Sequence, residues 1–487
     1  MDAWIVLSMI AVYFAGTTVV GSLMVRRSRR GDDWAIAGRH LGPVLLTVGI
    51  AATRVGGVAT YGVAGDVING GIWNLWYAVS AFVALAITGR FFAIPYRRLG
   101  LRTVGEIFVL RFGSRRCQAL TSLCVQTEFF IVNIIEPYII ARMLSAITGW
   151  PFGVAAAVAA VLLISYTTLG GLWASAVTNA IHSVAIFGGL LVVAIAGQWH
   201  LGGWSAVVHK TNAALAGAGV DPAAWWSPAG AGWLAVVGMF FAAAIHTPAA
   251  SIWVNFAAAA RDEKVVVPAF AAGGFVAMAM SLLAGWIGIE TLAMYGAAAQ
   301  LSNHQTITRL ATDLSPWIGG LALAAILAAV LSSGGPILLS SATMLVRDWL
   351  PSERWSETRR LGSYRIATIG LGVVGAAIAA LGPIPSILNL LLFAFAMVVP
   401  PAIAVAHVLF WKRTTETAAF WGMALGYSGS LLWYLAGHRL NLPVGVDPSY
   451  PATFIPLVTI PMLSRLTPDD AVRREAFFRK LREPAIM

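Results

Sequence analysis

Long apolar runs recur along the whole chain, and most of them are near 20 residues or longer. A helix of about 20 apolar residues is long enough to cross the hydrocarbon core of a bilayer. The composition agrees, because charged residues make up only 11% of the chain, against about 25% in soluble domains. We therefore predict an all-α polytopic membrane protein with about thirteen transmembrane helices. The predicted spans are residues 3–25, 43–67, 72–96, 118–148, 151–169, 172–197, 230–258, 266–297, 314–348, 362–382, 384–410, 417–437 and 451–465.

Basic residues are distributed unevenly between the two sets of loops. With the N-terminus outside, the inside segments hold most of them, at 26–39, 97–116, 261–264, 347–365, 412–413 and 465–482. The outside loops hold only Lys210, Arg309 and Arg439. This asymmetry follows the positive-inside rule, so the net charge of +11 does not call for a nucleic-acid partner. We predict a multi-pass protein of the cell (inner) membrane, in contact with the lipid bilayer, with a cytoplasmic tail at 466–487.

A charged residue lies near the middle of the second predicted span, in the stretch Gly49–Gly57. Arg54 at this depth costs a few kcal/mol even on lenient insertion scales, and such residues usually serve a function. Gly56 and Gly57 follow closely, so the helix can open there and present bare backbone carbonyls. Thr53 adds a hydroxyl group beside them. We interpret the stretch as part of a cavity that binds a solute or an ion.

Four motifs resemble those of one transporter family. Residues 32–42 resemble the amphipathic entry signature of sodium:solute symporters, and residues 166–174 resemble the family's aromatic-Thr-x-x-Gly-Gly-x-x-Ala motif. Residues 328–341 are similar to its long span with paired hydroxyl groups, and residues 102–112 are similar to its short cytoplasmic connector. Because the four motifs occur in the family's order, the chain is identified as a member of this family.

The resemblance implies a leucine-transporter-type fold with two inverted five-helix repeats, each of which begins with a broken helix. The repeats would cover residues 43–197 and 230–410. The span at 3–25 would be an N-terminal addition, and residues 417–465 would form peripheral C-terminal spans. The whole chain would then be a single membrane transporter domain.

The substrate of such a fold would bind between the two helix breaks. Gly56 and Gly57 would form the first break. The sequence supports the second break independently, because Pro248 lies mid-span and removes a backbone donor. The predicted substrate-binding residues lie near these breaks or carry polar groups in the neighbouring spans: Arg54, Gly56, Gly57, Asn133, Glu136, His246, Thr247 and Ser251.

The resemblance also implies an ion site. Carried over by position, its groups would be the carbonyls of Ala52 and Val55, with Ala329, Ser332 and Ser333 of the long span opposite. The paired hydroxyl groups are present in this chain.

The chain departs from the family at this ion site. Arg54 stands where family members generally have an aspartate or a small polar residue, and Asn179 and His182 fall near the position of another aspartate. Two like charges about 5 Å apart repel by roughly 3 kcal/mol at an effective dielectric near 20. Such repulsion would weaken sodium binding by about two orders of magnitude.

Two orientations of Arg54 therefore predict different mechanisms. If the guanidinium points at Ser332 and Ser333, it acts as a tethered substitute cation, and transport is independent of sodium or coupled to protons. If it points into the central cavity, it clamps a substrate carboxylate, because its planar fork matches a carboxylate bidentately. The sequence alone leaves both open.

Other ionisable residues lie within the predicted spans. We expect Glu136 to be the main counter-charge of Arg54, with Glu128 two turns earlier on a similar face. The pair either handles the substrate or a proton, or fixes helix packing. His182 and His246 either relay a coupling proton or serve as hydrogen-bonded packing residues.

The leading functional prediction is a secondary transporter of a small polar solute that bears a carboxylate, such as an amino acid or an organic acid. Its sodium coupling would be weakened or replaced, with a sodium ion or a proton as the coupling ion and no other cofactor. The alternative is a membrane enzyme on a transporter scaffold that acts on a small aminoacyl-type molecule, with Arg54, Glu136, His182 and His246 as an acid–base set.

Overall fold

A computed structural model describes residues 3–24, 40–297, 303–350, 352–384, 386–440 and 447–483. The side chains of residues 169–173, 303–304, 353 and 438–440 also lie outside the described part. Several predicted features therefore fall outside it: most of the entry signature at 32–42, the basic stretch at 26–39, the centre of the 166–174 motif and the side chain of Arg439.

The described elements are helices, apart from one isolated bridge between Leu41 and Ala260. The first group consists of α1 (Ala3–Met24), α3 (Pro43–Arg54), η3 (Val58–Gly62), α4 (Val63–Gly70), η4 (Ile72–Leu75), α5 (Trp76–Ile87), η5 (Thr88–Ala93), α6 (Ile94–Leu99), α7 (Glu106–Phe112), α8 (Arg115–Thr148), α9 (Phe152–Leu201), α10 (Trp204–Gly217) and α11 (Pro222–Trp225). The second group consists of α12 (Trp233–Phe240), η6 (Phe241–Ile245), η7 (Thr247–Ala249), α13 (Ser251–Ala259), α14 (Glu263–Tyr295), α15 (Asn303–Leu314), α16 (Pro316–Trp349), η9 (Ser352–Arg354), α17 (Glu357–Ala379), α18 (Ile387–Ala396), α19 (Val399–Phe410), α20 (Glu416–Leu440), α21 (Ser449–Leu466) and α22 (Ala471–Arg482).

The helices confirm the prediction of an all-α membrane protein. Within the described residues, eight helices are long and apolar enough to cross a membrane, or ten if each of two bent pairs is one span. The count of thirteen stays a prediction. The spans predicted at 151–169 and 172–197 form one helix, α9, because a glycine weakens a helix by only about 1 kcal/mol relative to alanine and need not end it.

Two of the candidate spans among the described residues are broken. The pair α3 and η3–α4 bends by 59° at Val55–Gly57, and the pair α12–η7 and α13 bends by 49° at Ala250. A π-helical turn adjoins each break, η3 after the first and η6 before the second. Such turns are frequent at functional sites. Pro248 lies in the turn that ends the first half of the second broken helix.

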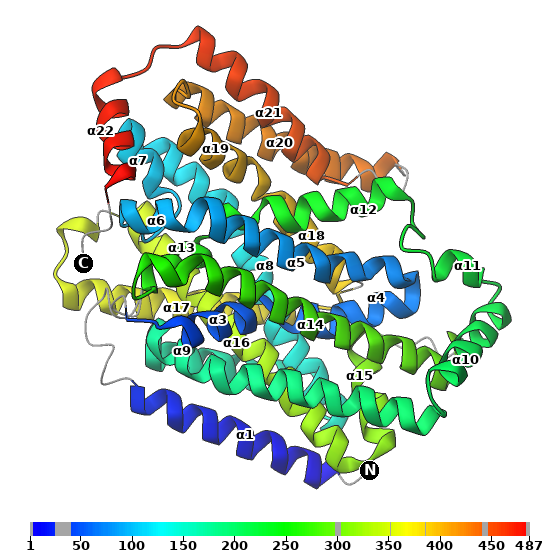
Figure 1. The fold of residues 1–487 in the computed structure, drawn as a ribbon. Coiled ribbons are helices and arrows are strands. Elements are labelled where there is room, and N and C mark those ends of the chain that lie inside the picture. The colour runs from blue at the N-terminus through cyan, green and yellow to red at the C-terminus, as the bar shows by residue number, and fades with distance from the viewer. Residues whose placement is uncertain are drawn as a thin grey trace.

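The long helix α16 runs through the interior of the bundle and is almost entirely buried (Figure 1). It packs against α9, α8, α1 and α3. Its buried face is rich in alanine and glycine, and small residues let neighbouring helices approach closely in a membrane. α16 therefore carries its hydroxyl groups directly against the first broken helix.

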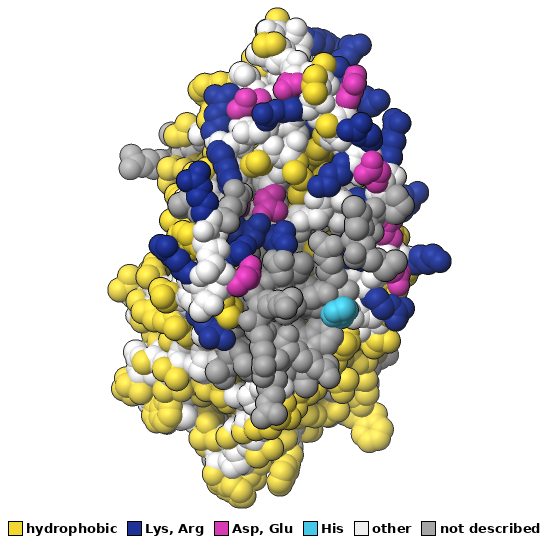
Figure 2. Space-filling view, turned by 90° about the vertical axis from the view of Figure 1, so that its left-hand side faces the viewer, with side chains coloured by type: hydrophobic (Ala, Val, Ile, Leu, Met, Phe, Trp, Pro, Cys, Tyr) yellow, Lys and Arg dark blue, Asp and Glu magenta, His cyan; other side chains and the backbone are white. Residues whose placement is uncertain are grey.

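Basic residues gather at one end of the bundle. Figure 2 shows Lys and Arg side chains crowded over the face that carries α6, α7 and α22 in Figure 1. The described side chains in the lower part of the same view are mainly apolar. The start of α1 lies at the opposite end of the bundle from α22 (Figure 1).

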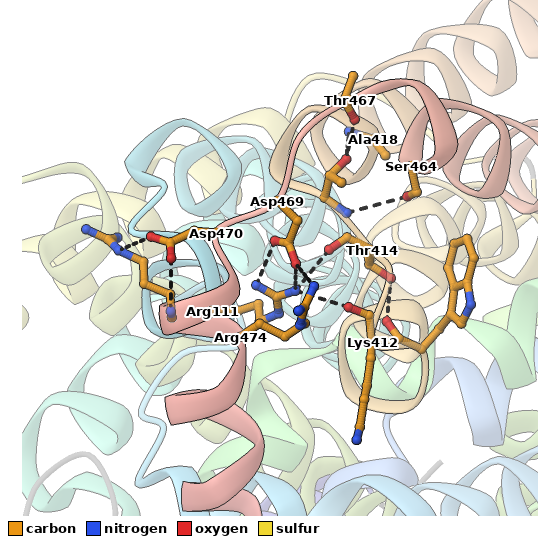
Figure 3. A network of polar contacts seen from close by, with 12 residues as sticks. Arg111, Lys412, Thr414, Ala418, Ser464, Thr467, Asp469, Asp470 and Arg474 are labelled. Atoms are coloured by element: carbon orange, nitrogen blue, oxygen red, sulfur yellow. Dashed lines mark hydrogen bonds and ion pairs between the residues drawn. The ribbon is translucent and has the colours of Figure 1, made fainter.

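A buried ion pair fastens the tail to this end of the bundle. Arg111 on α7 is 1% exposed and donates two parallel hydrogen bonds to Asp469, at 3.0 and 2.8 Å. It also donates to the carbonyls of Lys412 and Thr414, and Arg474 reaches Asp469 at 3.1 Å (Figure 3). This bidentate geometry fixes α22 against the connector that precedes α8.

Candidate functional site

A small cavity of about 40 Å³ lies between the two broken helices. Residues of α3, η3, α5, α8, α13, α16 and α18 line it. Its polar lining consists of Thr53, Arg54, Glu128, Glu136, His246 and Ser333, and its aromatic lining of Tyr77, Trp253 and Phe395. The cavity is smaller than most small-molecule sites, but its lining of apolar side chains with a few convergent polar groups is of the kind that such sites have.

Arg54 ends α3, and its guanidinium points into this cavity. It lies over the rings of Tyr77 and Phe395, with Cζ 5.4 and 5.2 Å from the ring centres. Its Nη2 donates a long hydrogen bond of 3.4 Å to the carbonyl of Ala243, whereas Nε is buried without a partner. No acid among the described residues lies within salt-bridge distance of Arg54. Much of its donor capacity is thus left for another group.

Glu136 does not pair with Arg54, which corrects the sequence prediction. Its carboxylate accepts hydrogen bonds from the backbone N–H of Gly57, at 3.1 and 3.3 Å, and from Ser333 Oγ at 2.7 Å. Gly57 begins the second half of the broken helix, where unpaired N–H groups and the helix dipole favour a negative charge. The carboxylate of Glu136 therefore has hydrogen-bond partners at the helix break and does not need Arg54 as its partner.

Four of the five predicted ion-site groups lie together, Ala52 on α3 and Ala329, Ser332 and Ser333 on α16, whereas Val55 follows the end of α3. Ser332 Oγ is 2.9 Å from the carbonyl oxygens of both Ala52 and Ala329, and Ser333 Oγ is 3.0 Å from that of Ala329. Oxygen atoms of this kind suit a hard cation. Because Ser333 also contacts Glu136, a carboxylate adjoins the site, which the sequence analysis did not foresee.

Asn179 stands on α9 beside the same groups. Its Nδ2 donates to Thr53 Oγ1 at 3.1 Å and lies 3.4 Å from the carbonyls of Gly49 and Ser332. An aspartate here would accept hydrogen bonds and carry charge, whereas the amide of Asn179 donates. The negative charge beside the hydroxyl groups comes instead from Glu136 on α8.

The two histidines occupy different environments. His246 stacks on Phe395 with ring centres 3.8 Å apart, and its Nδ1 lies 2.7 Å from the carbonyl of Ala242, so Nδ1 carries a proton. His182 lies on α9 between the hydroxyl groups of Tyr13 and Tyr166 and does not line the cavity. The four residues of the enzyme alternative are therefore not gathered around one cavity.

Several predicted substrate-binding residues also lie outside the cavity lining. The hydroxyl of Ser251 accepts a hydrogen bond from the N–H of Val104, in the connector before α7. The backbone of Asn133 packs against Gly375 of α17, and its buried amide atoms have no hydrogen-bond partner among the described residues. The hydroxyl of Thr247 lies 3.4 Å from the carbonyl of Ala243. Gly57 contributes its N–H to Glu136 and does not line the cavity. The remaining predicted residues, Arg54, Gly56, Glu136 and His246, all line it.

The sequence analysis did not assign Glu128, Tyr77, Trp253 and Phe395 to the binding site. Glu128 was noted as a second acid, and its position in an apolar span was a usable signal. The aromatic residues carried no such signal, because these spans are apolar on every face.

Comparison with known sequences shows to which protein family the chain belongs. The sequence model of the sodium:solute symporter family matches residues 34–426, which is most of the chain. The chain belongs to the sodium:solute symporter family. The resemblance drawn from the four motifs is thereby confirmed, and the family consists of multi-pass membrane transporters.

Relatives in this family match nearly the whole chain. The osmoregulated proline transporter of Bacillus subtilis (strain 168) is 24% identical over 483 residues, which is 96% of each chain. A sodium/proline symporter of Staphylococcus aureus (strain JH9) is 24% identical over 513 residues, covering 99% of this chain and 96% of the relative.

Solved structures show the same fold. A Na⁺-coupled sialic acid symporter, in a substrate-bound outward-open state, superposes with a TM-score of 0.80 at 19% identity, covering 96% of this chain and 98% of that one. Mhp1, a nucleobase-cation-symport-1 family transporter in a closed conformation, gives a TM-score of 0.57 at 16% identity, with 92% and 98% coverage. These neighbours establish the leucine-transporter-type fold.

Proposed function

We propose that this symporter transports a small solute bearing a carboxylate, which it binds through Arg54. The observation that carries the proposal is the position of the guanidinium, which lies in the cavity between the broken helices with most of its donors unused. An arginine presents its donors in a planar fork that matches a carboxylate. The relatives named for proline carry a solute of this class, which supports the proposal.

We propose further that sodium is the coupling ion and that Ala52, Val55, Ala329, Ser332 and Ser333 hold it. Among the described contacts of Arg54 there is no hydrogen bond to either of the paired hydroxyl groups. Its guanidinium instead lies over the rings of Tyr77 and Phe395, which weakens the reason for expecting a tethered substitute cation. Glu136 lies beside Ser333 and supplies a negative charge that offsets the positive charge of Arg54 in the same region.

The basic end of the bundle suggests the orientation. Lys and Arg side chains gather on the face that bears α6, α7 and α22 (Figure 2), and such faces are cytoplasmic by the positive-inside rule. We propose that this end is inside, that α1 begins outside, and that residues 43–197 and 230–410 are the two inverted repeats.

Thermal stabilisation of the purified protein tests the proposed function. The ligands are small carboxylates, including L-proline and lactate, and the analogues in which an uncharged carboxamide replaces the carboxylate, each in sodium and in potassium. A ligand that binds only the native state stabilises it by about 2.7 kcal/mol at 100 times its Kd. We expect stabilisation by carboxylates in sodium and none by the amides. Equal stabilisation by both classes, or by neither, would contradict the proposal.

Ser332→Ala is expected to raise the sodium concentration needed for half-maximal uptake by about tenfold or more. The change removes a hydroxyl that lies 2.9 Å from the carbonyls of Ala52 and Ala329, and one lost oxygen ligand costs on the order of 1.5 kcal/mol or more. Ser165→Ala, on the exposed side of α9, is the matched control. If the sodium dependence of uptake is unchanged in Ser332→Ala, the proposal that this site binds the coupling ion is wrong.

A further inference from the structure

Two groups of opposite charge line the cavity with polar atoms that lack partners. Arg54 is 8% exposed and its Nε makes no hydrogen bond; Glu128 is 4% exposed and its Oε2 makes none. Both side chains line the cavity between the broken helices. Buried charges are normally paired and hydrogen-bonded, so unpartnered atoms of both signs at one cavity indicate a ligand that completes them.

Glu136 also lines the cavity, but unlike Glu128 it has no oxygen without a hydrogen-bond partner. Both of its oxygens accept hydrogen bonds from Gly57 and Ser333, so it is committed to the helix break and to the ion site. It also occupies the N-terminus of the half-helix, a position where some transporters of this fold receive the carboxylate of the substrate. A carboxylate of the solute is therefore directed to Arg54 instead.

We infer that the solute is a zwitterion, and that Glu128 binds its ammonium group while Arg54 binds its carboxylate. The inference rests on the proposed function, because it takes Arg54 as the carboxylate partner. Trp253 also lines the cavity and adds an aromatic ring, whereas the rings of Tyr77 and Phe395 already contact the guanidinium of Arg54.

The test compares amino acids with the same molecules lacking the amine. Binding is measured for glycine and acetate, L-alanine and propionate, and L-proline and cyclopentanecarboxylate, with purified full-length protein in sodium. The variant is Glu128→Gln, which keeps the shape of the side chain and removes its charge. Glu290→Gln is the matched control, since Glu290 is also buried in a span but contacts Trp286 and does not line the cavity.

Wild type and Glu290→Gln are expected to bind each amino acid at least tenfold more tightly than its amine-free partner. Glu128→Gln is expected to lose about 10- to 100-fold in affinity for the amino acids, as a charged hydrogen bond is lost. It should still bind the amine-free acids as wild type does, which shows that it is folded and that Arg54 is intact.

The two ideas fail in different ways. If wild type binds both members of each pair equally, or if Glu128→Gln keeps its preference for amino acids, the zwitterion inference is wrong while carboxylate binding stands. If wild type binds no carboxylate of either kind, the proposed function fails and the inference fails with it.

Discussion

Replacing Gly56 with alanine is expected to abolish solute uptake. A Cβ atom at Gly56 would lie 2.6 Å from Ser333 Oγ and closer still to a carboxylate oxygen of Glu136. Real Cβ atoms do not approach other atoms this closely, and the interiors of proteins are too densely packed to absorb the change. The alanine would therefore displace Ser333 and Glu136 and break the hydrogen bonds through which Glu136 connects the helix break to the ion site.

The measurement is uptake by cells or proteoliposomes, normalised to the amount of protein in the membrane. Gly188→Ala is the control, because a Cβ at this glycine of α9 would meet no atom within 4 Å, and it should transport like wild type. Wild-type uptake by Gly56→Ala would show that the contacts around the break are not required for transport.

Removing the side chain of Glu136 is expected to destabilise the protein by about 2–4 kcal/mol. Ser333 keeps other acceptors, since its Oγ lies 3.0 Å from the carbonyl of Ala329 and 3.3 Å from that of Val330. The N–H of Gly57 has no such substitute among its described hydrogen bonds. Glu136→Ala therefore leaves a buried donor unpaired at a helix N-terminus and removes the charge that favours this end of the helix.

Glu136→Gln separates the two effects. The amide oxygen can still accept from Gly57, so the melting temperature of this variant should fall less than that of Glu136→Ala. The lost charge should still raise the sodium concentration needed for half-maximal uptake, by about tenfold or more. Melting temperatures and sodium dependence that match wild type in both variants would show that the acid serves neither the break nor the ion site.

Much of the fold could be predicted from the sequence because the length of an apolar run directly reports a span. The run at 118–148 became α8 (Arg115–Thr148), and the run at 314–348 became α16 (Pro316–Trp349). Proline and paired glycines marked both helix breaks. The sequence erred at residues 151–197, where a pair of glycines was taken as a loop and the helix α9 continues through it.

The site was predicted less completely, because its geometry depends on which way each side chain points. An ionisable group in an apolar span is a visible signal, and Arg54, Glu136 and His246 all line the cavity. Their partners were not visible: the N–H of Gly57 competes for Glu136 only once the helix has broken. Asn133 looked equally suitable in the sequence but lies against α17.

The affinity of Arg54→Ala for small carboxylates, measured in sodium and in potassium, tests the central claim most directly. If Arg54 clamps the solute, the variant should lose about 100-fold or more in affinity for L-proline and lactate. Its weak affinity for the carboxamide analogues should not change. If Arg54→Ala instead binds carboxylates as tightly as wild type and gains a sodium dependence that wild type lacks, the guanidinium is a substitute cation and the account is wrong.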